Sequence, residues 1–349
     1  TRSARRAIAT LETICAESVD ARSDIEVIRI NDLNPDVANI CYMYNYDSLQ
    51  GVADKHSTLT PLDSNHISVG TRRKSVSYST HSSIDDLDCS DVDLVIDASG
   101  ESVNGDAIRR LLGTYYGLRI VATHCHPDAE LHLVLGANHN ASGLQKMRFV
   151  SSSICDATAI APVLSVLEQE FGVERAHVTT VHPWLSYQNL LDGPSTSWSN
   201  PGDIHHHYPV GRAALDNLIP KPTTAVACTL MSLEDFDAPV SSFSYRVPTS
   251  IVGSANLVMQ LRRAPASADA LKECFARFDE PLQWPIIGFN DLPLISRDFM
   301  NRRESAIVDM RWTELNGPQL HLVLWYDNEN GYAERVLDGA VYLASEGVR

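Results

Sequence analysis

Residues 25–32, IEVIRIND, decide the fold of the first half of the chain. The run from Ile25 to Ile30 is rich in branched apolar residues and ends at Asn31-Asp32, which predicts a strand followed by a turn. Further strands are predicted at 92–97, 118–123 and 147–150, and a helix at 105–112. Strands that alternate with helices predict a parallel α/β sheet.

The segment before this strand predicts a helix. Apolar residues at positions 7, 8, 11, 14 and 15 follow helical spacing from Arg5 to about Glu17. A doubly wound domain normally begins with a strand that leads into a glycine-rich G-x-G-x-x-G phosphate loop, and neither precedes this helix. We therefore expect the first strand and its glycine loop to lie upstream of Thr1, and we favour this over a domain that lacks a normal dinucleotide loop.

From Cys155 onward the pattern changes. Residues 159–171 predict an apolar helix that ends at Gly172. Alternating residues at 176–182 and 242–247 predict strands of a mixed or antiparallel sheet, so this half differs from the first.

Two further segments complete the expected organisation. Residues 52–90 are rich in Ser, Asp and Thr, which predicts short edge strands and turns, and the tail at 332–344 returns to helical spacing. The predicted fold class is α/β, with one parallel-sheet domain in residues 1–154 and 328–349. A second domain with a mostly antiparallel sheet is expected in residues 155–327.

The charge balance argues against some partners. The 349 residues include 28 Lys+Arg against 44 Asp+Glu, a formal net charge of −16. Binding to nucleic acid or to an anionic membrane requires a basic face, so neither partner is expected. The hydrophobic fraction of 44% is ordinary for a globular protein, and no apolar run approaches the roughly 18 residues of a membrane span, which predicts a soluble chain.

The cysteines and histidines do not have metal-site spacing. Seven cysteines, an odd number, occur without any C-x-x-C pair, which favours a reducing, cytoplasmic compartment over a disulfide framework or a zinc ribbon. No charged start is followed by an apolar segment, so no signal peptide is predicted. Three adjacent histidines, 205–207, lie in a long predicted loop at 195–208, but adjacent side chains point in different directions and do not readily share one ion. We therefore expect no metal.

Three residues stand where their chemistry has a use. Asp32 follows a strand, where a carboxylate can accept hydrogen bonds from both ribose hydroxyls of NAD and would repel the extra phosphate of NADP. Cys155 begins a helix, whose dipole and free N–H groups favour a thiolate. His182 ends a strand, and a cysteine paired with a histidine can be a nucleophile with its base. Alone, each has an ordinary explanation: strand-terminal aspartates are common, and a buried cysteine is usually inert.

A longer series of motifs occurs in one order along the chain. The series comprises Ile30-Asn31-Asp32, Tyr46-Asp47-Ser48, Ser99-Gly100, Gly136-Ala137-Asn138-His139, Cys155 with Ala161-Pro162, Thr179-Thr180-Val181-His182, Gln188, Asp192-Gly193-Pro194-Ser195, Gly211-Arg212-Ala213-Ala214, Asn217-Leu218-Ile219-Pro220, Tyr245-Arg246-Val247-Pro248-Thr249 and Trp325-Tyr326-Asp327-Asn328-Glu329-Asn330-Gly331-Tyr332. It closely resembles the glyceraldehyde-3-phosphate dehydrogenase family, an NAD-dependent family of glycolysis. The resemblance spans nearly the whole chain.

The resemblance implies a role for each matching residue. Cys155 would add to an aldehyde to give a hemithioacetal, and His182 would take the proton and stabilise the oxyanion. Hydride transfer to NAD then leaves a thioester, which inorganic phosphate cleaves in this family. The implied cofactor residues are Arg2 at the pyrophosphate, Asp32 at the ribose, Ser99 on the turn after the central strand and Asn328 at the nicotinamide carboxamide. The implied phosphate residues are Arg246 for the substrate, and Arg212 and Thr223 on the side of the attacking phosphate; the alternative for both arginines is a surface or interface ion pair.

The chain departs from the family around the cysteine and in the phosphate sites. Ile154 precedes the cysteine and Asp156 follows it, where the family has small hydroxyl residues. Leu185 and Tyr187 replace two family threonines that help to bind phosphates, and Thr224 replaces a glycine. The arginines are retained while most hydroxyl partners are lost, so the site for inorganic phosphate is altered.

These observations predict an NAD-dependent aldehyde dehydrogenase of the phosphorylating type. The expected substrate is a small phosphorylated aldehyde such as glyceraldehyde 3-phosphate, with inorganic phosphate as second substrate and a homotetramer as the assembly. One alternative is a divergent paralogue that oxidises another aldehyde or releases its acyl group to water or another acceptor. Another is a catalytically weak oligomeric binding or scaffold protein, which the presence of both Cys155 and His182 argues against.

Asp156 has two possible roles that the sequence does not separate. A carboxylate that faces the pocket repels phosphate and raises the pKa of the neighbouring thiol. A carboxylate that caps the helix directs its charge away from the pocket.

Overall fold

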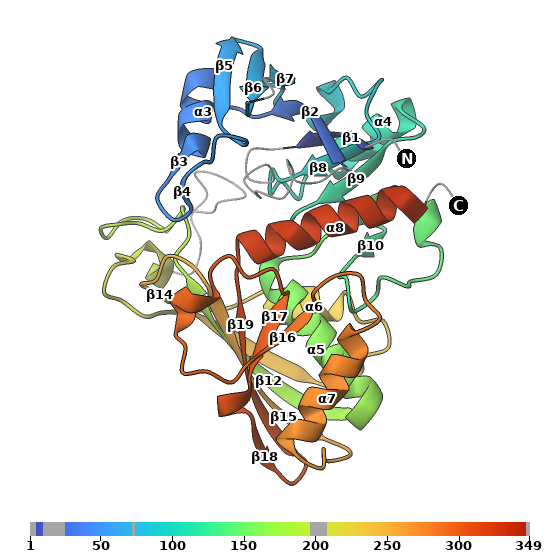
Figure 1. The fold of residues 1–349 in the computed structure, drawn as a ribbon, viewed down its shortest axis with the longest axis vertical. Helices are drawn as coiled ribbons and strands as arrows, with labels where there is room; N and C mark the ends of the chain where they lie inside the picture. Colours follow the sequence, from blue (N-terminus) through green and yellow to red (C-terminus); the bar gives the residue numbers. More distant parts are fainter. Residues whose placement is uncertain (1–4, 10–24, 72–73, 196–207, 347–349) are drawn as a thin grey trace. The chain divides into compact units, whose positions relative to one another are not determined.

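The computed structural model describes residues 5–9, 25–71, 74–195 and 208–346. The chain divides into two compact units. The first comprises Thr1–Leu131, Ala141–Ser152 and Val336–Arg349, and the second comprises His132–Asn140 and Ser153–Arg335. Two large sheets organise the fold (Figure 1).

The first sheet has nine strands in the order β10-β11-β9-β8-β1-β2-β7-β6-β5. The strands from β11 to β7 pair in parallel, whereas β7, β6 and β5 form an antiparallel edge. The bounds are β1 (Arg5–Ala9), β2 (Ile25–Asn31), β5 (Leu59–Asp63), β6 (His66–Val69), β7 (Lys74–Ser79), β8 (Leu94–Asp97), β9 (Arg119–Ala122), β10 (Leu131–His132) and β11 (Phe149–Ser151). The predicted parallel sheet and its short edge strands are confirmed.

The first strand corrects a prediction. Arg5–Ala9, which the spacing of apolar residues assigned to a helix, forms β1 and pairs in parallel with both β2 and β8. The helix predicted over these residues is therefore wrong, whereas the expected strand and glycine loop upstream of Thr1 stay a prediction. Five residues are too few to distinguish helical from strand periodicity, and hydrogen bonding to two neighbouring strands decides the conformation. Residues 10–24, over which the predicted helix continued, lie outside the described residues.

The chain reverses its direction of travel across the sheet at β1. It proceeds from β1 to β2 and β7 on one side, and later returns to β8, β9 and β11 on the other. Such a reversal is a topological switch point, and open α/β sheets bind ligands at the carboxyl ends of the strands beside it. The residues that follow β2 and β8 are therefore placed at a potential ligand site.

Two helices, a small hairpin and two 3₁₀ turns complete the description of the first unit. Asp36 caps α3 (Val37–Asn45), since its carboxylate accepts the N–H groups of Ala38 and Asn39, and α4 spans Gly105–Thr114. β3 (Tyr46–Asp47) and β4 (Gly51–Val52) form a small hairpin, and η1 (Ile84–Asp86) and η2 (Leu144–Lys146) are single 3₁₀ turns. One apolar cluster joins α4 to the sheet and comprises Leu87, Cys89, Val92, Val95, Ile108, Leu111, Leu118, Ile120, Ala122 and Phe149. A second joins α3 to the edge strands and comprises Ile30, Val37, Ile40, Cys41, Leu59, Ile67, Val76 and Tyr78.

The second sheet has eight strands in the order β13-β14-β12-β15-β19-β17-β16, with β18 paired to β19. The β12–β14 and β16–β17 pairs are parallel and the remaining pairs are antiparallel, which confirms a mostly antiparallel sheet. The strands are β12 (Val173–Pro183), β13 (Ile219–Lys221), β14 (Val240–Val247), β15 (Gly253–Leu261), β16 (Ile287–Asn290), β17 (Ala306–Asp309), β18 (Glu314–Asn316) and β19 (Gln319–Tyr326). The other elements are α6 (Ala225–Leu230), α7 (Ala268–Asp279), α8 (Asn330–Glu346), η3 (Tyr208–Gly211), η4 (Ser296–Phe299) and η5 (Met310–Trp312).

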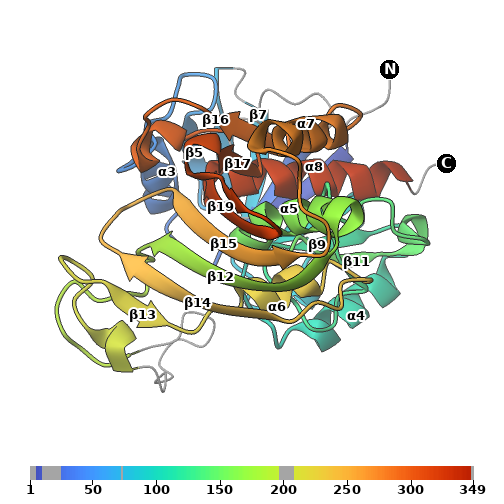
Figure 2. The ribbon, with the colours of Figure 1, turned by 90° about the horizontal axis from the view of Figure 1, so that it is seen from below.

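The helix α5 (Cys155–Phe171) covers one face of the second sheet. It contacts β12, β15, β17 and β19 (Figure 2). Every residue from 156 to 167 is buried. The helix ends at Gly172, as predicted, where a φ of +68° suits glycine. The opposite face remains partly exposed in the described structure, and its side chains include His177, Thr179, Val181, Phe243, Tyr245, Val258 and Val323.

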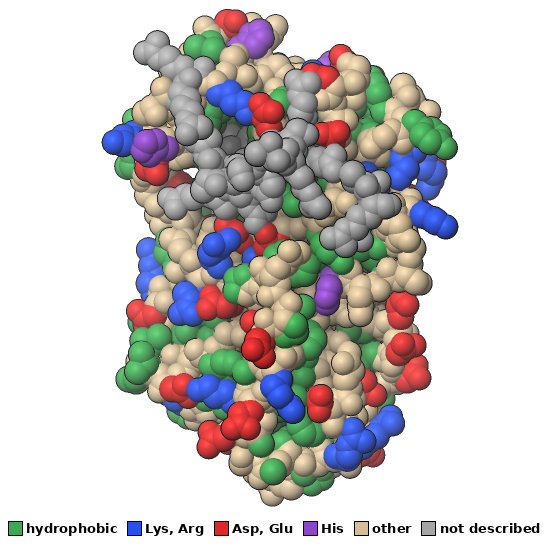
Figure 3. Space-filling model, turned by 45° about the vertical axis from the view of Figure 1, so that its right-hand side comes forward, with side chains coloured by type: hydrophobic (Ala, Val, Ile, Leu, Met, Phe, Trp, Pro, Cys, Tyr) green, Lys and Arg blue, Asp and Glu red, His purple; other side chains and the backbone are tan. Residues whose placement is uncertain are grey.

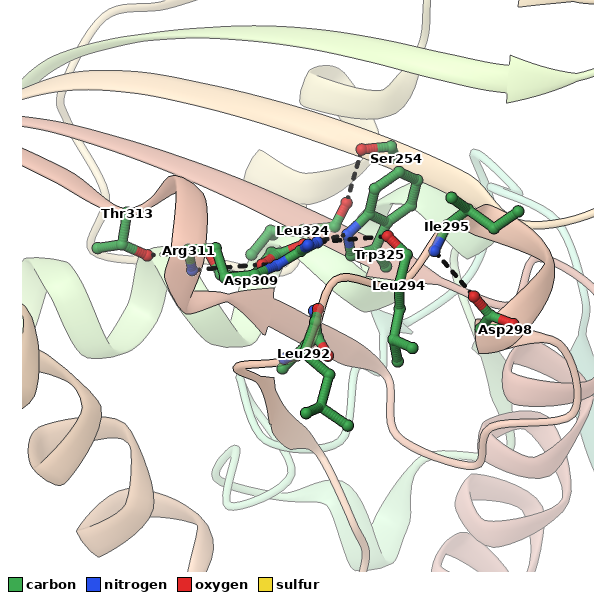
Figure 4. A network of polar contacts seen from close by, with 11 residues as sticks. Ser254, Leu292, Leu294, Ile295, Asp298, Asp309, Arg311, Thr313, Leu324 and Trp325 are labelled. Carbon is green, nitrogen blue, oxygen red and sulfur yellow. Dashed lines mark hydrogen bonds and ion pairs between the residues drawn. The ribbon is translucent and has the colours of Figure 1, made fainter.

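A buried carboxylate links two strands of this sheet, β17 and β19. Asp309, which is fully buried at the end of β17, accepts two hydrogen bonds from the guanidinium of Arg311 and one from Trp325 Nε1 on β19 (Figure 4). The hydrogen bond from Trp325 to Asp309 links β19 to β17 near the carboxyl end of β19, next to Tyr326. Burial of this carboxylate is tolerated because its oxygens are paired.

The surface of the described residues is mixed in charge. On the face drawn in Figure 3, acidic and basic side chains are interspersed rather than gathered into one large patch. Among the described helices, none combines the length and the apolar character needed to cross a membrane.

Candidate active site

The register of the second sheet places five residues in one row. Tyr326 on β19 pairs with Gly253 on β15, and one more step in the β12–β15 register places Gly253 beside His182. His182 pairs in turn with Arg246 on β14, and Arg246 with Ile219 on β13. Because paired residues share a face of a sheet, this row crosses the surface on which α5 packs.

Cys155 meets this row at its centre. As the first residue of α5, it places its Sγ 3.6 Å from Nε2 of His182. Nδ1 of His182 lies 2.8 Å from the carbonyl oxygen of Pro183. A ring nitrogen beside a carbonyl carries the proton, so Nε2 is the acceptor and faces the thiol.

The Cys155–His182 pair is uncharged at neutral pH. Burial, followed by the nearby Asp156 carboxylate, raises the pKa of the Cys155 thiol above its ordinary value. Burial lowers the pKa of His182 to about 4, so the ring is neutral. The helix start was expected to favour a thiolate, but burial and Asp156 outweigh it.

Asp156 lies beside the Cys155–His182 pair and does not cap the helix. It is 7% exposed, and its Oδ1 accepts a hydrogen bond from the hydroxyl of Tyr326, a side chain that is itself buried. One oxygen of Asp156, Sγ of Cys155 and one ring nitrogen of His182 all lie within 4.8 Å of one another. The pocket role for Asp156 therefore has direct geometric support.

Gly253 makes room for the Tyr326 ring. A Cβ at this position would lie 2.6 Å from Cε2 and Cζ of Tyr326 and 2.8 Å from its hydroxyl oxygen. No side chain fits in that space, so glycine is required for Tyr326 to lie across β15 toward Asp156.

The other end of the row is cationic. Arg246 is 8% exposed, its Nη2 donates a long 3.5 Å hydrogen bond to the hydroxyl of Tyr187, and its Nε is buried without a hydrogen-bond partner. Lys221 on β13 lies two residues after Ile219, which pairs with Arg246, so the side chains of Lys221 and Arg246 share one face of the sheet. Burial and then Arg246 lower the pKa of Lys221. Among the described residues neither cation has an ion pair with a carboxylate, an arrangement that suits an anionic ligand.

Two of the three expected phosphate residues have other partners in the described structure. Nε of Arg212 donates to Asp192 at 2.9 Å, and both side chains are more than half exposed, so the ion-pair alternative describes Arg212. Oγ1 of Thr223 accepts the N–H of Ala225 at the start of α6. Of the three expected phosphate residues, Arg246 is the one that the described strand register pairs with His182.

The expected cofactor residues of the first unit lie at the switch point. Asp32 directly follows β2, and its Oδ1 accepts the N–H of Asn34 at 2.8 Å. Ser99 follows β8, and its N–H donates to Asp97. Because β2 and β8 flank β1, both residues stand at the carboxyl edge where a dinucleotide binds, and a carboxylate acceptor suits ribose hydroxyls. The described residues therefore fit the adenosine end of NAD; Arg2 lies outside them, and residues 1–24 contain no glycine.

The remaining residue expected at the cofactor, Asn328, supports a strained turn in the second unit. Its Oδ1 accepts the N–H of Val252 at 3.0 Å. Val252 has a φ of +70°, which is rare for a branched residue and stores strain beside Gly253. The hydrogen bond from Val252 fixes the orientation of the Asn328 amide, as is required of a side chain that positions a ligand.

Three residues of the site were not found from the sequence. Lys221 lies between two prolines and two residues before Thr223, an expected phosphate residue. This position could have indicated a second cation for the phosphate site. Tyr326 was part of a recognised motif without a role of its own, and Gly253 carried no signal, because their roles arise from the pairing of β15 with β19.

A parallel sheet with an acidic residue at its switch point, together with a cysteine at a helix start beside a histidine of a second, mixed sheet, is typical of two-domain α/β dehydrogenases. The family profile for the glyceraldehyde 3-phosphate dehydrogenase C-terminal domain matches residues 154–328, half of the chain. Glyceraldehyde-3-phosphate dehydrogenase 1 of Bacillus cereus is 28% identical over 330 residues, covering 93% of each chain. The cytosolic enzyme of Pisum sativum is 29% identical over 330 residues, covering 93% of this chain and 92% of its own. The chain belongs to the glyceraldehyde-3-phosphate dehydrogenase family, whose members use NAD as cofactor.

Proposed function

We propose that this protein oxidises a small phosphorylated aldehyde, such as glyceraldehyde 3-phosphate, with NAD, through a hemithioacetal and a thioester at Cys155. The observation that carries the proposal is the 3.6 Å approach of Cys155 Sγ to the acceptor nitrogen of His182. A thiol next to a neutral, oriented imidazole is an activated nucleophile with its base.

The protonation states fit the two proton transfers that this reaction needs. As Sγ attacks the aldehyde carbon, Nε2 of His182 takes the thiol proton and returns it to the developing oxyanion, which gives the hemithioacetal. NAD, when bound, would supply the acceptor for the hydride of the hemithioacetal carbon. At that step Nε2 removes the hydroxyl proton, and the C=O bond of the thioester forms. A histidine that is neutral at pH 7 is ready for both transfers.

The cationic end of the row is the proposed site for the charged group of the substrate. Arg246 and Lys221 lie on one face of the sheet, with the Tyr187 hydroxyl beside Arg246. A guanidinium and an ammonium together can satisfy the oxygens of a phosphate. Arg212 and Thr223, which the resemblance assigned to a phosphate, are less favoured because both have other partners.

We propose that Asp32, Ser99 and Asn328 contact the cofactor, with Arg2 at its pyrophosphate, and that residues 1–154 and 328–349 act as the cofactor domain. Asp32 is expected to select NAD, because a carboxylate repels the 2′-phosphate of NADP.

We further propose a cytoplasmic homotetramer. The partly exposed face of the second sheet, with Val181, Tyr245 and Val258, offers apolar area for contact between copies. Sedimentation equilibrium is expected to give four times the chain mass of 38.5 kDa, and a purely monomeric species would contradict the assembly.

The test of the activity is NADH formation by matched variants. Cys155→Ser is expected to abolish it, and His182→Asn to slow it by roughly 10²–10⁴. Cys274→Ser is the control, since Cys274 is a buried free cysteine on α7. Retention of more than a few per cent of the activity in Cys155→Ser would exclude the thioester route.

A further inference from the structure

We propose that Asp156 makes water, rather than inorganic phosphate, the acceptor of the acyl group, with its carboxylate as the general base of deacylation. This inference rests on the proposed thioester at Cys155. It replaces the phosphorylating second step, which the family resemblance implies, with hydrolysis.

The first argument is the charge distribution along the row. Arg246 lies on one side of His182, whereas Tyr326, which is bonded to Asp156, lies on the other side of it. One end of the site therefore attracts anions, and the other end carries the Asp156 carboxyl group. A phosphorylated aldehyde and a free phosphate would both compete for the cationic end that Arg246 and Lys221 form.

The second argument is the set of side chains at the anionic end. Ile154 is apolar, Asp156 offers only acceptor oxygens, and the hydroxyl of Tyr326 is already donated to Asp156. No side-chain donor for phosphate is left among these three. A water molecule, in contrast, donates to a carboxylate and can be held there.

The third argument is distance. A carboxylate oxygen of Asp156 lies within 4.8 Å of Cys155 Sγ. A thioester carbon on Sγ and a water held by Asp156 would be neighbours, which is the geometry that general-base catalysis needs. The Tyr326 hydrogen bond orients the carboxylate, and Gly253 permits that orientation.

The step balances without another reactant. The water oxygen forms a bond to the thioester carbon while Asp156 takes one water proton. The carbon–sulfur bond then breaks, and the sulfur leaves with its electron pair and takes the proton from Asp156. The products are the carboxylic acid and the free Cys155 thiol, and nothing is oxidised or reduced.

Acylation by p-nitrophenyl acetate tests this step apart from the dehydrogenase reaction. This activated ester acylates a thiol without NAD or an aldehyde, so its p-nitrophenolate burst reports the acyl-enzyme and its steady rate reports deacylation. The burst is expected in the wild type and absent in Cys155→Ser. Added inorganic phosphate is expected to change the wild-type steady rate by less than about twofold, with acetate as the product.

Two substitutions of Asp156 separate its roles. Asp156→Asn is expected to keep the burst amplitude and to lower the steady rate by roughly 10²-fold, the scale of a lost general base. Asp156→Thr, which restores a hydroxyl donor, is expected to make deacylation depend on phosphate and to yield acetyl phosphate. Asp106→Asn is the matched control, because Asp106 is an exposed first-turn aspartate of α4.

The inference is overturned if wild-type deacylation rises in proportion to phosphate and yields acetyl phosphate, or if Asp156→Asn deacylates as fast as the wild type. Failure of the proposed function has a different signature: aldehyde and NAD then give no NADH, while the ester arm still reports on Asp156.

Discussion

Replacement of Asp156 by asparagine is expected to lower the pKa of the Cys155 thiol. The carboxylate lies within 4.8 Å of Sγ and opposes its ionisation. Two unit charges at that distance interact by about 3.5 kcal/mol at an effective dielectric of 20 and by about 0.9 kcal/mol in bulk water. These limits correspond to about 2.5 and about 0.6 pKa units, and a partly exposed thiol falls between them. We expect a decrease of about 1–2 units, because asparagine removes the charge while its amide oxygen still accepts from Tyr326.

The assay is the rate of iodoacetamide alkylation of Cys155 against pH, read by mass spectrometry of the peptide that contains it. Only the thiolate reacts, so the midpoint of the profile reports the pKa. Cys155→Ser supplies the background from the other thiols, and Asp106→Asn controls for the loss of one surface charge. A midpoint that stays in place or rises in Asp156→Asn would refute the electrostatic argument.

Three further predictions follow from the row of residues and the switch point. Gly253→Ala is expected to displace the Tyr326 ring and to slow acyl transfer by at least about tenfold while the chain stays folded by circular dichroism, and an unchanged rate would contradict the packing argument. Lys221→Met is expected to raise KM for a phosphorylated aldehyde by roughly 10–100-fold but to leave KM for an uncharged aldehyde within about twofold; equal effects on both would remove the anion site. Asp32→Gly is expected to reduce the ratio of kcat/KM for NAD over NADP, mainly through NAD, and a wild type that prefers NADP would exclude this role.

The sequence predicted those elements whose periodicity of apolar residues matches the face that they bury in the fold. The strand that begins at Ile25, the apolar helix that ends at Gly172 and the tail helix all combine periodicity with a clear boundary residue. β1 was missed because its five residues obtain their conformation from pairing with two other strands. α3 was not predicted, although Asp36 at its amino terminus is a typical capping residue.

The site was predicted less completely than the fold. The spacing of Cys155 and His182 is visible in the chain, and the structure brings the two side chains to within hydrogen-bond distance. The sequence does not distinguish Arg212 from Arg246 as a phosphate ligand. The pairing of β14 with β12 places Arg246 beside His182, whereas Arg212 forms an ion pair with Asp192. The role of Lys221 also became visible only in the structure, because the pairing of β13 with β14 decides that it lies near Arg246.

The central claim is that Cys155 carries the acyl group during oxidation. The most direct measurement is the intact mass of the protein after rapid mixing with NAD and glyceraldehyde 3-phosphate and an acid quench. We expect one acyl group on Cys155 for each NADH formed in the first turnover, accumulating further in Asp156→Asn and absent from Cys155→Ser. NADH that forms without any adduct on Cys155 would contradict the account.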